Sequence, residues 1–561
     1  MKYPPPPPAP TRKLRIIAQD PGVRSNGGIV TAVVDVAAET LGPGPRGYRV
    51  QIVDYDSSTH KLYQPAALPP DHDPYRDASD DALLSNPGFH AQNVYAIVMR
   101  TLARFEFALG RRVNWGFSGH QIQVAPHAFA DANAFYSERD HALMFGYFPG
   151  RQGLVFSCLS HDVIAHETAH ALLDGLRERY TDPSSPQQAA FHEGFSDVVA
   201  LLSVFSLPGV VEAALEPKNR SRRIPREKLK PEALRETALL GLADQMGQEM
   251  SASRGDALRR SAKLRPSPDY LSSPDFQEPH LLGEVLVAAM MNAFLEVWVH
   301  RLSGLGEVAQ GALDRQRVAE EGAHAANHLL TMSIRALDYC PPTDIEFRDF
   351  LSALLTADRE IQPDDSKYHY RDTLLESFQD YGIRPSSKGE AGVWEPPEAA
   401  LVYDRTHFES MQRDPDEVFR FIWENRAALR LCEDAYSQVQ SVRPCLRLGP
   451  DGFPLRETVI EYIQMITLRA DELVQMKVRA PDAMAPSAEV KLYGGGALIF
   501  DEYGRLKFHV RNSILNADRQ TSRLESLWRH GYFEKGAAAL SRFASLHRRR
   551  AMDLPPLRKE V

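Results

Sequence analysis

The feature that most constrains this chain is a pair of histidines, four residues apart, in an apolar segment. His166 and His170 bound an H-E-x-x-H motif, and the residues around it contain no helix breaker. Residues i and i+4 of a helix share one face, so the two imidazoles can bind a single zinc ion. Glu167 lies one position round the helix and can reach a zinc-bound water without being a ligand. Burying these polar side chains without such partners would be costly.

A second pair of residues at the same spacing follows downstream. Glu193 and Asp197 are also four residues apart, on a segment whose apolar residues predict a buried helix. A catalytic zinc takes three protein ligands and leaves the fourth position to water. We therefore expect Glu193 to be the third ligand, and Asp197 to accept the remaining N–H of one zinc histidine and fix its orientation. The sequence predicts one zinc ion per chain.

The H-E-x-x-H motif followed by E-x-x-S-D at residues 193–197 resembles the thermolysin-like gluzincin metallopeptidases, including their fungalysin branch. The resemblance covers about residues 89–383. It implies an α+β fold with two lobes, in which a β-rich N-terminal lobe and a mostly helical C-terminal lobe hold the zinc between them. It further implies a zinc-dependent endopeptidase that acts on peptide or protein substrates, with Glu167 as the general base.

The resemblance also assigns roles to residues outside the two motifs. The run Asn133-Ala134-Phe135-Tyr136 resembles the family's edge strand, which binds the substrate backbone. Asp275 and His280 match the spacing of a pair in which the histidine stabilises the oxyanion and the aspartate orients that histidine. Tyr180 falls near the family's oxyanion-contacting tyrosine. Most positions of the family's acidic calcium cluster are not matched, so calcium is not predicted.

Composition excludes several other classes of protein. With 43% hydrophobic and 25% charged residues, the 561-residue chain is expected to be globular. Its formal net charge of −9 argues against a dedicated nucleic-acid binder, and no apolar run approaches the ~20 residues that would span a membrane. Because Pro4–Pro8 leave no room for the apolar part of a secretory signal, we expect a cytoplasmic protein. Four scattered cysteines are expected to be buried or incidental thiols: Cys158, Cys340, Cys432 and Cys445.

Shifts in composition predict how the chain is organised, although they do not predict its oligomeric state. Helices are expected near 415–435 and 455–475, and a hairpin near 497–510. The last unit is expected to cover the substrate cleft or to mediate assembly, without chemistry of its own. The predicted regions are a Pro-rich tail (1–13), a β-rich region (14–88), the zinc peptidase core (89–384), a linker (385–397) and a C-terminal α+β accessory domain (398–561).

A second interpretation of the zinc motifs stays open at this stage. The chain could be a non-catalytic, zinc-stabilised module that binds peptides or mediates assembly on a peptidase fold. The missing secretory signal motivates it, because the proteins that the chain resembles are mostly secreted proenzymes. Glu167, Asp275 and His280 favour the enzyme, since a pure binding module would not need them.

Overall fold

The computed structural model describes residues 10–25, 27–150, 153–182, 184–215, 221–240, 260–276, 278–308 and 311–533. Helices and several separate sheets confirm an α+β fold. The segment 1–9 and the residues after 533 lie outside the described residues. Strand β1 (Thr11–Ile17) pairs along its whole length with β4 (Thr31–Ala37). Residues 11–13 therefore belong to a strand and not to the predicted tail.

A mixed sheet of five strands forms the β-rich part of the molecule. Strand β8 (Ile122–Phe129) runs parallel to β5 (Val50–Ile52) on one side and to β10 (Ala142–Pro149) on the other. The second edge of β10 pairs first with β9 (Ala134–Ser137) and then with β11 (Leu154–Phe156), both antiparallel. In the described part of the chain β9 pairs with β10 alone, so its other edge is available.

Helix α2 (Pro87–Leu109) packs along this sheet and is the first long helix of the described chain. The Asn86 side chain accepts a hydrogen bond from the Gly88 N–H at its start. Gly110 ends the helix in the left-handed region, with φ of 67°. A Cβ on Gly110 would lie 2.3 Å from the carbonyl oxygen of Leu446, so only glycine permits this contact with a strand of the C-terminal sheet.

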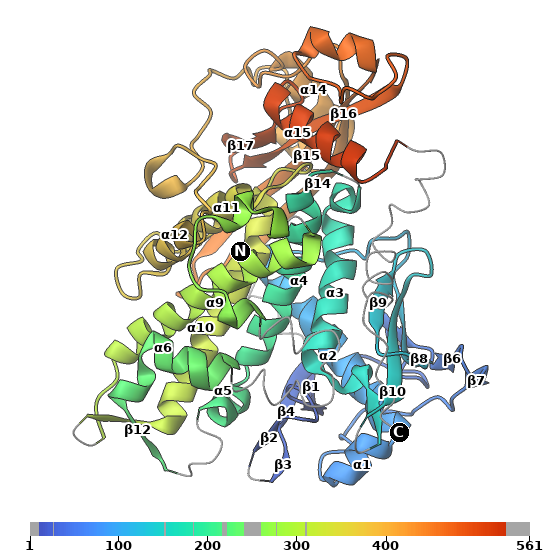
Figure 1. Cartoon of the computed structure of the whole chain (residues 1–561), viewed down its shortest axis with the longest axis vertical. Coiled ribbons are helices and arrows are strands. Elements are labelled where there is room, and N and C mark those ends of the chain that lie inside the picture. Colours follow the sequence, from blue (N-terminus) through green and yellow to red (C-terminus); the bar gives the residue numbers. More distant parts are fainter. Residues whose placement is uncertain are drawn as a thin grey trace, which may run out of the picture.

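A layer of long helices follows in the chain. Figure 1 shows α3 between β9 and α4, and both α4 and α9 pack against α10. The main helices are α3 (His161–Leu176), α4 (Pro186–Phe205), α9 (Pro279–Ser303), α10 (Arg315–Ala336), α11 (Phe347–Ile361) and α12 (Tyr370–Asp380). The shorter elements are β2 (Arg24–Ser25), β3 (Gly28–Ile29), β6 (Tyr55–Asp56), β7 (Lys61–Leu62), α1 (Asp80–Ser85), α5 (Pro208–Ala214), β12 (Arg223–Pro225), α6 (Pro231–Leu234) and β13 (Ala312–Asp314).

Helices α4 and α9 cross at two glycines. A Cβ on Gly194 would lie 2.8 Å from the carbonyl oxygen of Gly283, and a Cβ on Gly283 would lie 2.9 Å from that of Ala190. Real Cβ atoms do not approach backbone oxygens so closely, so both positions require glycine. The crossing brings Glu193 of α4 next to His280, three residues before Gly283 in the first turn of α9.

By length and composition alone, α9 could cross a membrane. However, 83% of its most apolar window is buried inside the fold, as in the core helix of many globular proteins. The bent pair α4 and α5, with an angle of 89° between the two helices, passes the same test together. These helices are weak evidence for a membrane span.

As far as residue 533, the C-terminal unit contains a four-stranded antiparallel sheet, three α-helices and a 3-10 helix (Ala470–Met476). In order, its strands are β14 (Tyr436–Leu448), β15 (Pro454–Arg469), β16 (Glu489–Phe500) and β17 (Leu506–Asn512). Its helices are α13 (Phe408–Met411), α14 (Pro415–Glu424) and α15 (Ala517–Arg529). The predicted hairpin corresponds to β16 and β17, and α14 forms the first part of the predicted helix 415–435.

The predicted helix at 455–475 is wrong, because most of this segment is strand β15. Eight consecutive residues, 457–464, are buried, so both faces of the strand are covered. A strand buried on both faces loses the alternation of apolar and polar residues that would distinguish it from a buried helix. Pairing with β14 on one side and β16 on the other fixes the extended conformation.

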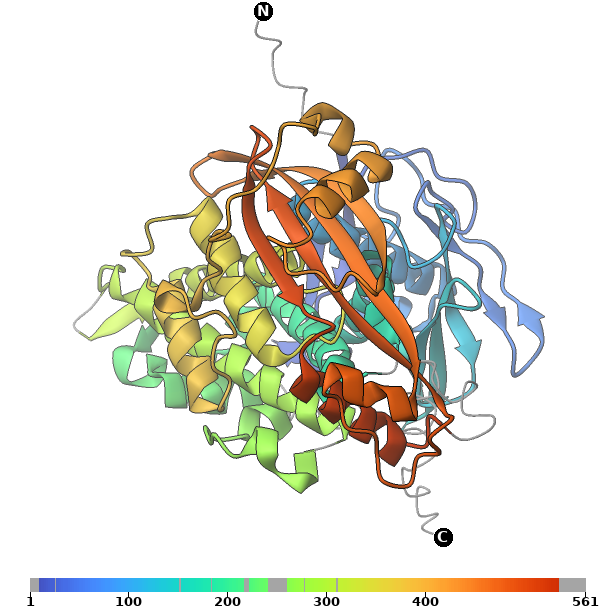
Figure 2. The same ribbon diagram turned by 90° about the horizontal axis from the view of Figure 1, so that it is seen from above.

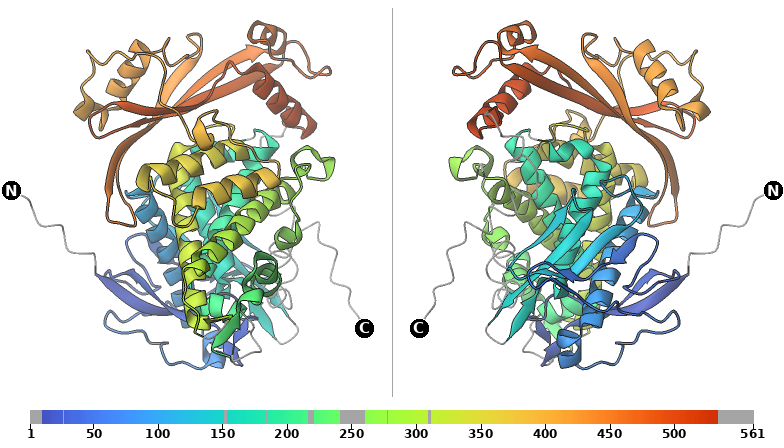
Figure 3. Two further views of the ribbon diagram at one scale, coloured as in Figure 1. Left: turned by 90° about the vertical axis from the view of Figure 1, so that its left-hand side faces the viewer. Right: turned by 90° about the vertical axis from the view of Figure 1, so that its right-hand side faces the viewer.

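The C-terminal sheet packs closely on the helical layer, as Figures 2 and 3 show. Val459 and Phe508 belong to the same hydrophobic core as the helices. The segment predicted as a linker also packs on the helices: Trp394 donates to the Tyr339 carbonyl at 2.9 Å, and the Ser387 N–H donates to the Ser352 hydroxyl at 3.0 Å. Segment 385–397 is therefore part of the core and not a free linker.

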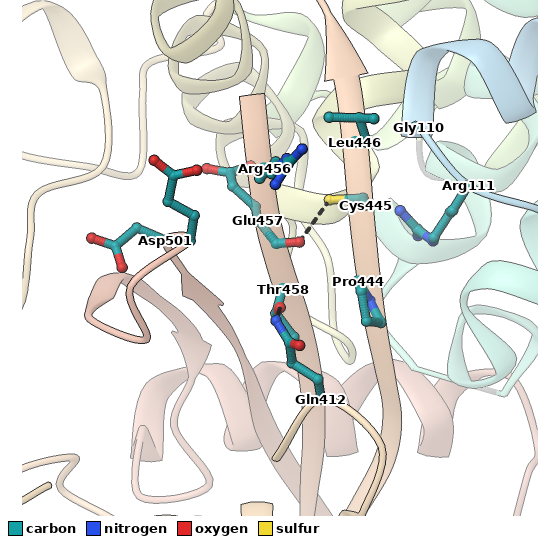
Figure 4. Close-up of a pocket in the computed structure, with 11 residues that line it drawn as sticks. Gly110, Arg111, Gln412, Pro444, Cys445, Leu446, Arg456, Glu457, Thr458 and Asp501 are labelled. Carbon is teal, nitrogen blue, oxygen red and sulfur yellow. Dashed lines mark hydrogen bonds between the residues drawn. The ribbon is translucent and has the colours of Figure 1, made fainter. Parts of the chain in front are cut away.

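A pocket of about 570 Å³ lies between the end of α2 and the C-terminal sheet (Figure 4). Its walls carry charges of both signs, among them Arg111, Arg456 and Asp501. Arg111 is already bound to both carboxylate oxygens of Asp338, at 2.5 and 2.7 Å. None of the predicted site residues lines this pocket.

Candidate metal centre

Helix α3 places the two motif histidines on one face, as their spacing predicted. Every residue of α3 except Gly175 is buried. The His166 and His170 side chains turn their Nε2 atoms toward each other at 2.7 Å. The helix therefore presents two nitrogen donors at a single point inside the protein.

Helix α4 brings the third predicted ligand to the same point. The Glu193 Oε2 atom lies 3.6 Å from His166 Nε2 and 3.8 Å from His170 Nε2. One ligand atom from each of the three residues lies within 4.8 Å of the other two. We call His166, His170 and Glu193 the His/Glu cluster.

The outer nitrogen of each histidine is already bound to another side chain. His166 Nδ1 lies 2.7 Å from Asp197 Oδ1, which is the contact predicted for Asp197. His170 Nδ1 lies 2.8 Å from His192 Nδ1 and 3.0 Å from the Ser196 hydroxyl. Because that hydroxyl donates to the His192 carbonyl, its oxygen can accept the Nδ1 proton of His170.

These partners fix the tautomers and so the chemistry of the cluster. With both protons on Nδ1, the two Nε2 atoms face each other as lone pairs, beside the carboxylate of Glu193. Three electron-pair donors at one point are relieved by a proton or a metal cation between them. Two imidazoles and one carboxylate are a donor set that suits zinc, so the residues fit the ion that the motif implies.

Glu167 is fully buried beside this cluster and contacts the edge strand of the mixed sheet. Its Oε2 atom accepts a hydrogen bond from the Tyr136 N–H of β9 at 3.0 Å. The Tyr136 hydroxyl donates to Asp174 Oδ2, one turn beyond His170 on α3, at 2.9 Å. Both ends of Tyr136 are therefore held by α3, and β9 lies against the helix that carries the motif.

Asp174 was not predicted as part of this region. Burial raises its pKa to about 7, although the hydrogen bond from Tyr136 opposes this rise. The negative charges of Glu138 and Glu178 raise it further. The Asp174 carboxyl therefore gains and loses its proton near neutral pH.

The structure also brings His280 to the cluster, but without its predicted partner. His280 Nδ1 lies 3.3 Å from Glu193 Oε2. Asp275 is exposed on the 3-10 turn Pro274–Phe276, and among the described residues no hydrogen bond or ion pair joins it to His280. The turn ends before α9 begins, so the two side chains are carried by different elements. The predicted orientation of His280 by Asp275 is therefore not supported.

Tyr180 is placed in the core instead of beside the predicted oxyanion. It follows α3 on the 3-10 turn Glu178–Thr181, with 2% of its surface exposed. Its hydroxyl donates to the Pro341 carbonyl at 2.6 Å, and its ring packs edge-on against Phe191. A hydroxyl used in this way cannot donate to a substrate, so the prediction for Tyr180 is corrected.

The sequence reasoning missed His192 and Ser196, although a signal was present. They are four residues apart on α4, shifted by one position from Glu193 and Asp197, and so lie on an adjacent strip of the helix. His192 and Ser196 contact His170, whereas Asp197 contacts His166.

Comparisons with known proteins do not identify this chain. No family model matches it, and no curated protein matches it.

Proposed function

We propose that this protein is a zinc-dependent endopeptidase with the two-lobed architecture of the thermolysin-like enzymes. His166, His170 and Glu193 would hold the zinc ion. When bound, zinc supplies the Lewis acidity that lowers the pKa of a coordinated water towards ~7. The geometry of the three donor groups and their fixed tautomers support this ion.

One observation carries the proposal from metal binding to hydrolysis. Glu167 is a buried carboxylate that lies beside the cluster and contacts an edge strand through the Tyr136 N–H. A structural metal site needs no second carboxylate there. A general base needs one, close to both the attacking water and the substrate. Glu167 takes a proton from the water as it attacks the scissile carbonyl, and then delivers that proton to the leaving amine.

Strand β9 would hold the substrate. The Tyr136 N–H points away from β10, toward Glu167, and residues two apart in a strand point the same way. Ala134 and Tyr136 therefore present backbone groups at this edge, where their N–H groups bind the Asn133 side chain at 2.9 Å and Glu167 at 3.0 Å. An extended peptide that adds as a further strand would replace these contacts. Asn133 and Phe135 flank these groups; the Asn133 carbonyl accepts the Gly146 N–H at 2.8 Å and anchors the start of the strand.

His280 would donate to the oxyanion that forms during the attack. Its imidazole lies against Glu193, so it is next to the reacting carbonyl of a peptide bound at this cluster. The loss of one such donor typically lowers the rate by about 10²–10³-fold. Glu193 replaces Asp275 as the carboxylate that orients this ring.

The test is Glu167→Gln, which removes the base while keeping the shape of the side chain. We expect turnover of a quenched peptide library to fall by about 10²–10⁴-fold and the zinc content to stay near one equivalent in the His/Glu cluster. The control is Glu138→Gln, which removes an exposed carboxylate just beyond β9. Unchanged turnover in Glu167→Gln would refute the mechanism.

The same library separates the enzyme from a binding module. Cleavage that a chelator stops and zinc restores supports the peptidase. Tight capture of peptides without cleavage by the zinc-loaded protein would instead show a zinc-stabilised peptide binder.

A further inference from the structure

We propose that the protein carries a second metal site, built from His90, His127 and Cys158, that binds one zinc-class transition-metal ion. We call these residues the His/Cys cluster. The proposal does not depend on the function proposed above, because no residue is shared between the two clusters.

Three separate elements bring these side chains together. His90 comes from α2, His127 from β8, and Cys158 from the 3-10 turn Ser157–Leu159 just before α3. One ligand atom of each lies within 4.8 Å of those of the other two. The His90 Nδ1 and His127 Nε2 atoms are only 2.8 Å apart. All three side chains are buried, with at most 2% of their surface exposed.

The outer nitrogens of the two rings are committed to acceptors. His90 Nε2 lies 3.0 Å from the Leu84 carbonyl oxygen, which can only accept, so Nε2 carries the proton. His127 Nδ1 lies 2.8 Å from Asp54 Oδ2, and the His127 backbone N–H donates to the other oxygen of that carboxylate. The inner nitrogens, His90 Nδ1 and His127 Nε2, therefore face each other as the two atoms that can carry lone pairs.

Something positive must lie between these lone pairs, and it is either a proton or a metal ion. With its proton on Nε2, His90 offers the lone pair of its Nδ1 atom toward His127. A proton on His127 would satisfy the two nitrogens. It would not explain why a thiol completes the group.

The third donor favours the metal ion over the proton. The Cys340 and Cys445 thiols donate to the carbonyl oxygens of Ala336 and Glu457, each at 3.3 Å. Among the described residues, no hydrogen bond is formed by the Cys158 sulfur, which lies beside the two nitrogens instead. Two imidazoles and a thiolate are the soft donor set that zinc and copper prefer.

The charges around the cluster suit a divalent ion. Cys158 must lose its thiol proton to bind a metal ion, because the thiolate and not the thiol is the ligand. Metal binding would release this proton, as at other thiolate sites. The thiolate and the Asp54 carboxylate, which orients His127, would then balance two positive charges.

The surroundings indicate a structural site. The Phe156 ring packs against both imidazoles, with centroids 4.9 Å from His90 and 5.2 Å from His127. This packing and the burial of all three donors shield the cluster from solvent, unlike the edge strand beside the His/Glu cluster. A metal ion here would fasten α2 and β8 to the segment that leads into α3.

Cobalt(II) is the probe that distinguishes the two clusters. We expect full-length protein, stripped by a chelator and titrated with Co²⁺, to bind two equivalents and to develop a near-ultraviolet thiolate-to-cobalt charge-transfer band. The His/Glu cluster contains no sulfur and cannot give this band. The double variant His166→Ala/His170→Ala should lose one equivalent and keep the band.

The matched variants are Cys158→Ser and Cys340→Ser, each of which changes one buried thiol. Cys158→Ser should lose the band and the second equivalent, and Cys340→Ser should keep both. If the unaltered protein binds one equivalent without the band, or if the band persists in Cys158→Ser, the proposal is wrong. The first of these results would assign the contact between His90 and His127 to a shared proton.

Discussion

The His/Glu cluster and the His/Cys cluster share the same arrangement of two histidines. In each, two buried imidazoles point inner nitrogens at each other, 2.7 and 2.8 Å apart, while the outer nitrogens are held by oxygen acceptors or another histidine. The clusters differ in what lies beyond the donors. The His/Glu cluster has a second carboxylate, Glu167, and the available edge of β9. Beyond its donors, the His/Cys cluster has the Asp54 carboxylate, which holds His127, and the Phe156 ring.

This difference teaches that ligands alone do not separate a reactive metal site from a structural one. A reactive site needs a proton acceptor and a place for substrate, and both come from outside the ligand set. In the proposed enzyme, Glu167 is the proton acceptor and β9, which contacts it through the Tyr136 N–H, is the place for substrate. At the His/Cys cluster the single carboxylate, Asp54, is already used to hold His127.

The largest expected difference in turnover is between variants that each lack one ligand, one variant for each cluster. Metal-assisted attack is worth several kcal/mol, so Glu193→Ala should lower peptide turnover by about 10³-fold or more. Cys158→Ser should leave the turnover of folded protein within about twofold, because that cluster takes no part in the chemistry. Steady-state rates at saturating zinc test this contrast. A similar loss of turnover in both variants would mean that the clusters are not separate in function.

Asp174 should make the stability of the protein depend on pH. Its folded pKa of about 7 exceeds the ordinary value of 3.8, so between these values the folded state binds more protons than the unfolded chain. The free energy of unfolding therefore falls as the pH rises from about 4 to about 7, by on the order of a few kcal/mol.

Asp174→Asn should remove this dependence, because an amide does not titrate and can still accept the hydrogen bond from Tyr136. Urea unfolding near pH 5 and near pH 8 measures how the free energy of unfolding depends on pH. Glu525→Gln is the control, because Glu525 is exposed and is not among the groups that shift the pKa of Asp174. An equal fall in stability for the unaltered protein and Asp174→Asn would assign the pH dependence to other groups.

The side chains that orient the histidines allow a matched pair of tests. Asp197→Asn should weaken metal binding at the His/Glu cluster by about 10–100-fold, as changes to such partners typically do. Asp54→Asn should weaken metal binding at the His/Cys cluster by a similar factor, as followed by the thiolate band, and should leave turnover unchanged. Competition titrations with a chelator measure both affinities. If Asp197→Asn changed the thiolate band, the two sites would be coupled.

The smallest expected effect concerns the helix crossing that brings Glu193 to His280. Gly194→Ala places a methyl group against the Gly283 carbonyl and should destabilise the fold by about 1–3 kcal/mol. Gly209→Ala is the control, since a Cβ there meets nothing within 4 Å. Thermal unfolding compares the two variants, and their turnover shows whether the crossing also positions the site. Equal stability in both variants would mean that the helices adjust without cost.

The parts of the site that lie on one helix could be predicted from the sequence. The spacing of four residues is a helical repeat, so it reveals the pair His166 and His170 and the pair Glu193 and Asp197 without any knowledge of the fold. The His/Cys cluster has no such signal, because its residues lie on three elements whose meeting depends on the packing of α2 against the mixed sheet. The prediction for Tyr180 was wrong for a related reason. Its position in the sequence matched that of an oxyanion-contacting tyrosine, but its hydroxyl points into the core.

Helices α3 and α4 were predicted because each is apolar along most of its length and carries polar residues at helical spacing. Strand β15 was mistaken for a helix because it is buried on both sides, and segment 385–397 was mistaken for a linker because glycine, serine and proline also occur in chain that is packed. Trp394 was the signal against a free linker, since a large apolar side chain is seldom left in solvent.

The ion pairs beneath the C-terminal sheet have a consequence for how the protein unfolds. Arg447 of β14 is fully buried and pairs with Asp338 before α11 and with Glu457 of β15, whose other oxygen accepts from Lys507 at 2.6 Å. The pair of Arg447 with Asp338 joins the sheet to the helical layer, and the pairs with Glu457 extend the same buried network within the sheet. The sheet and the helical core should therefore melt in a single cooperative transition, and a protease that cuts near residue 400 should release no independently folded fragment.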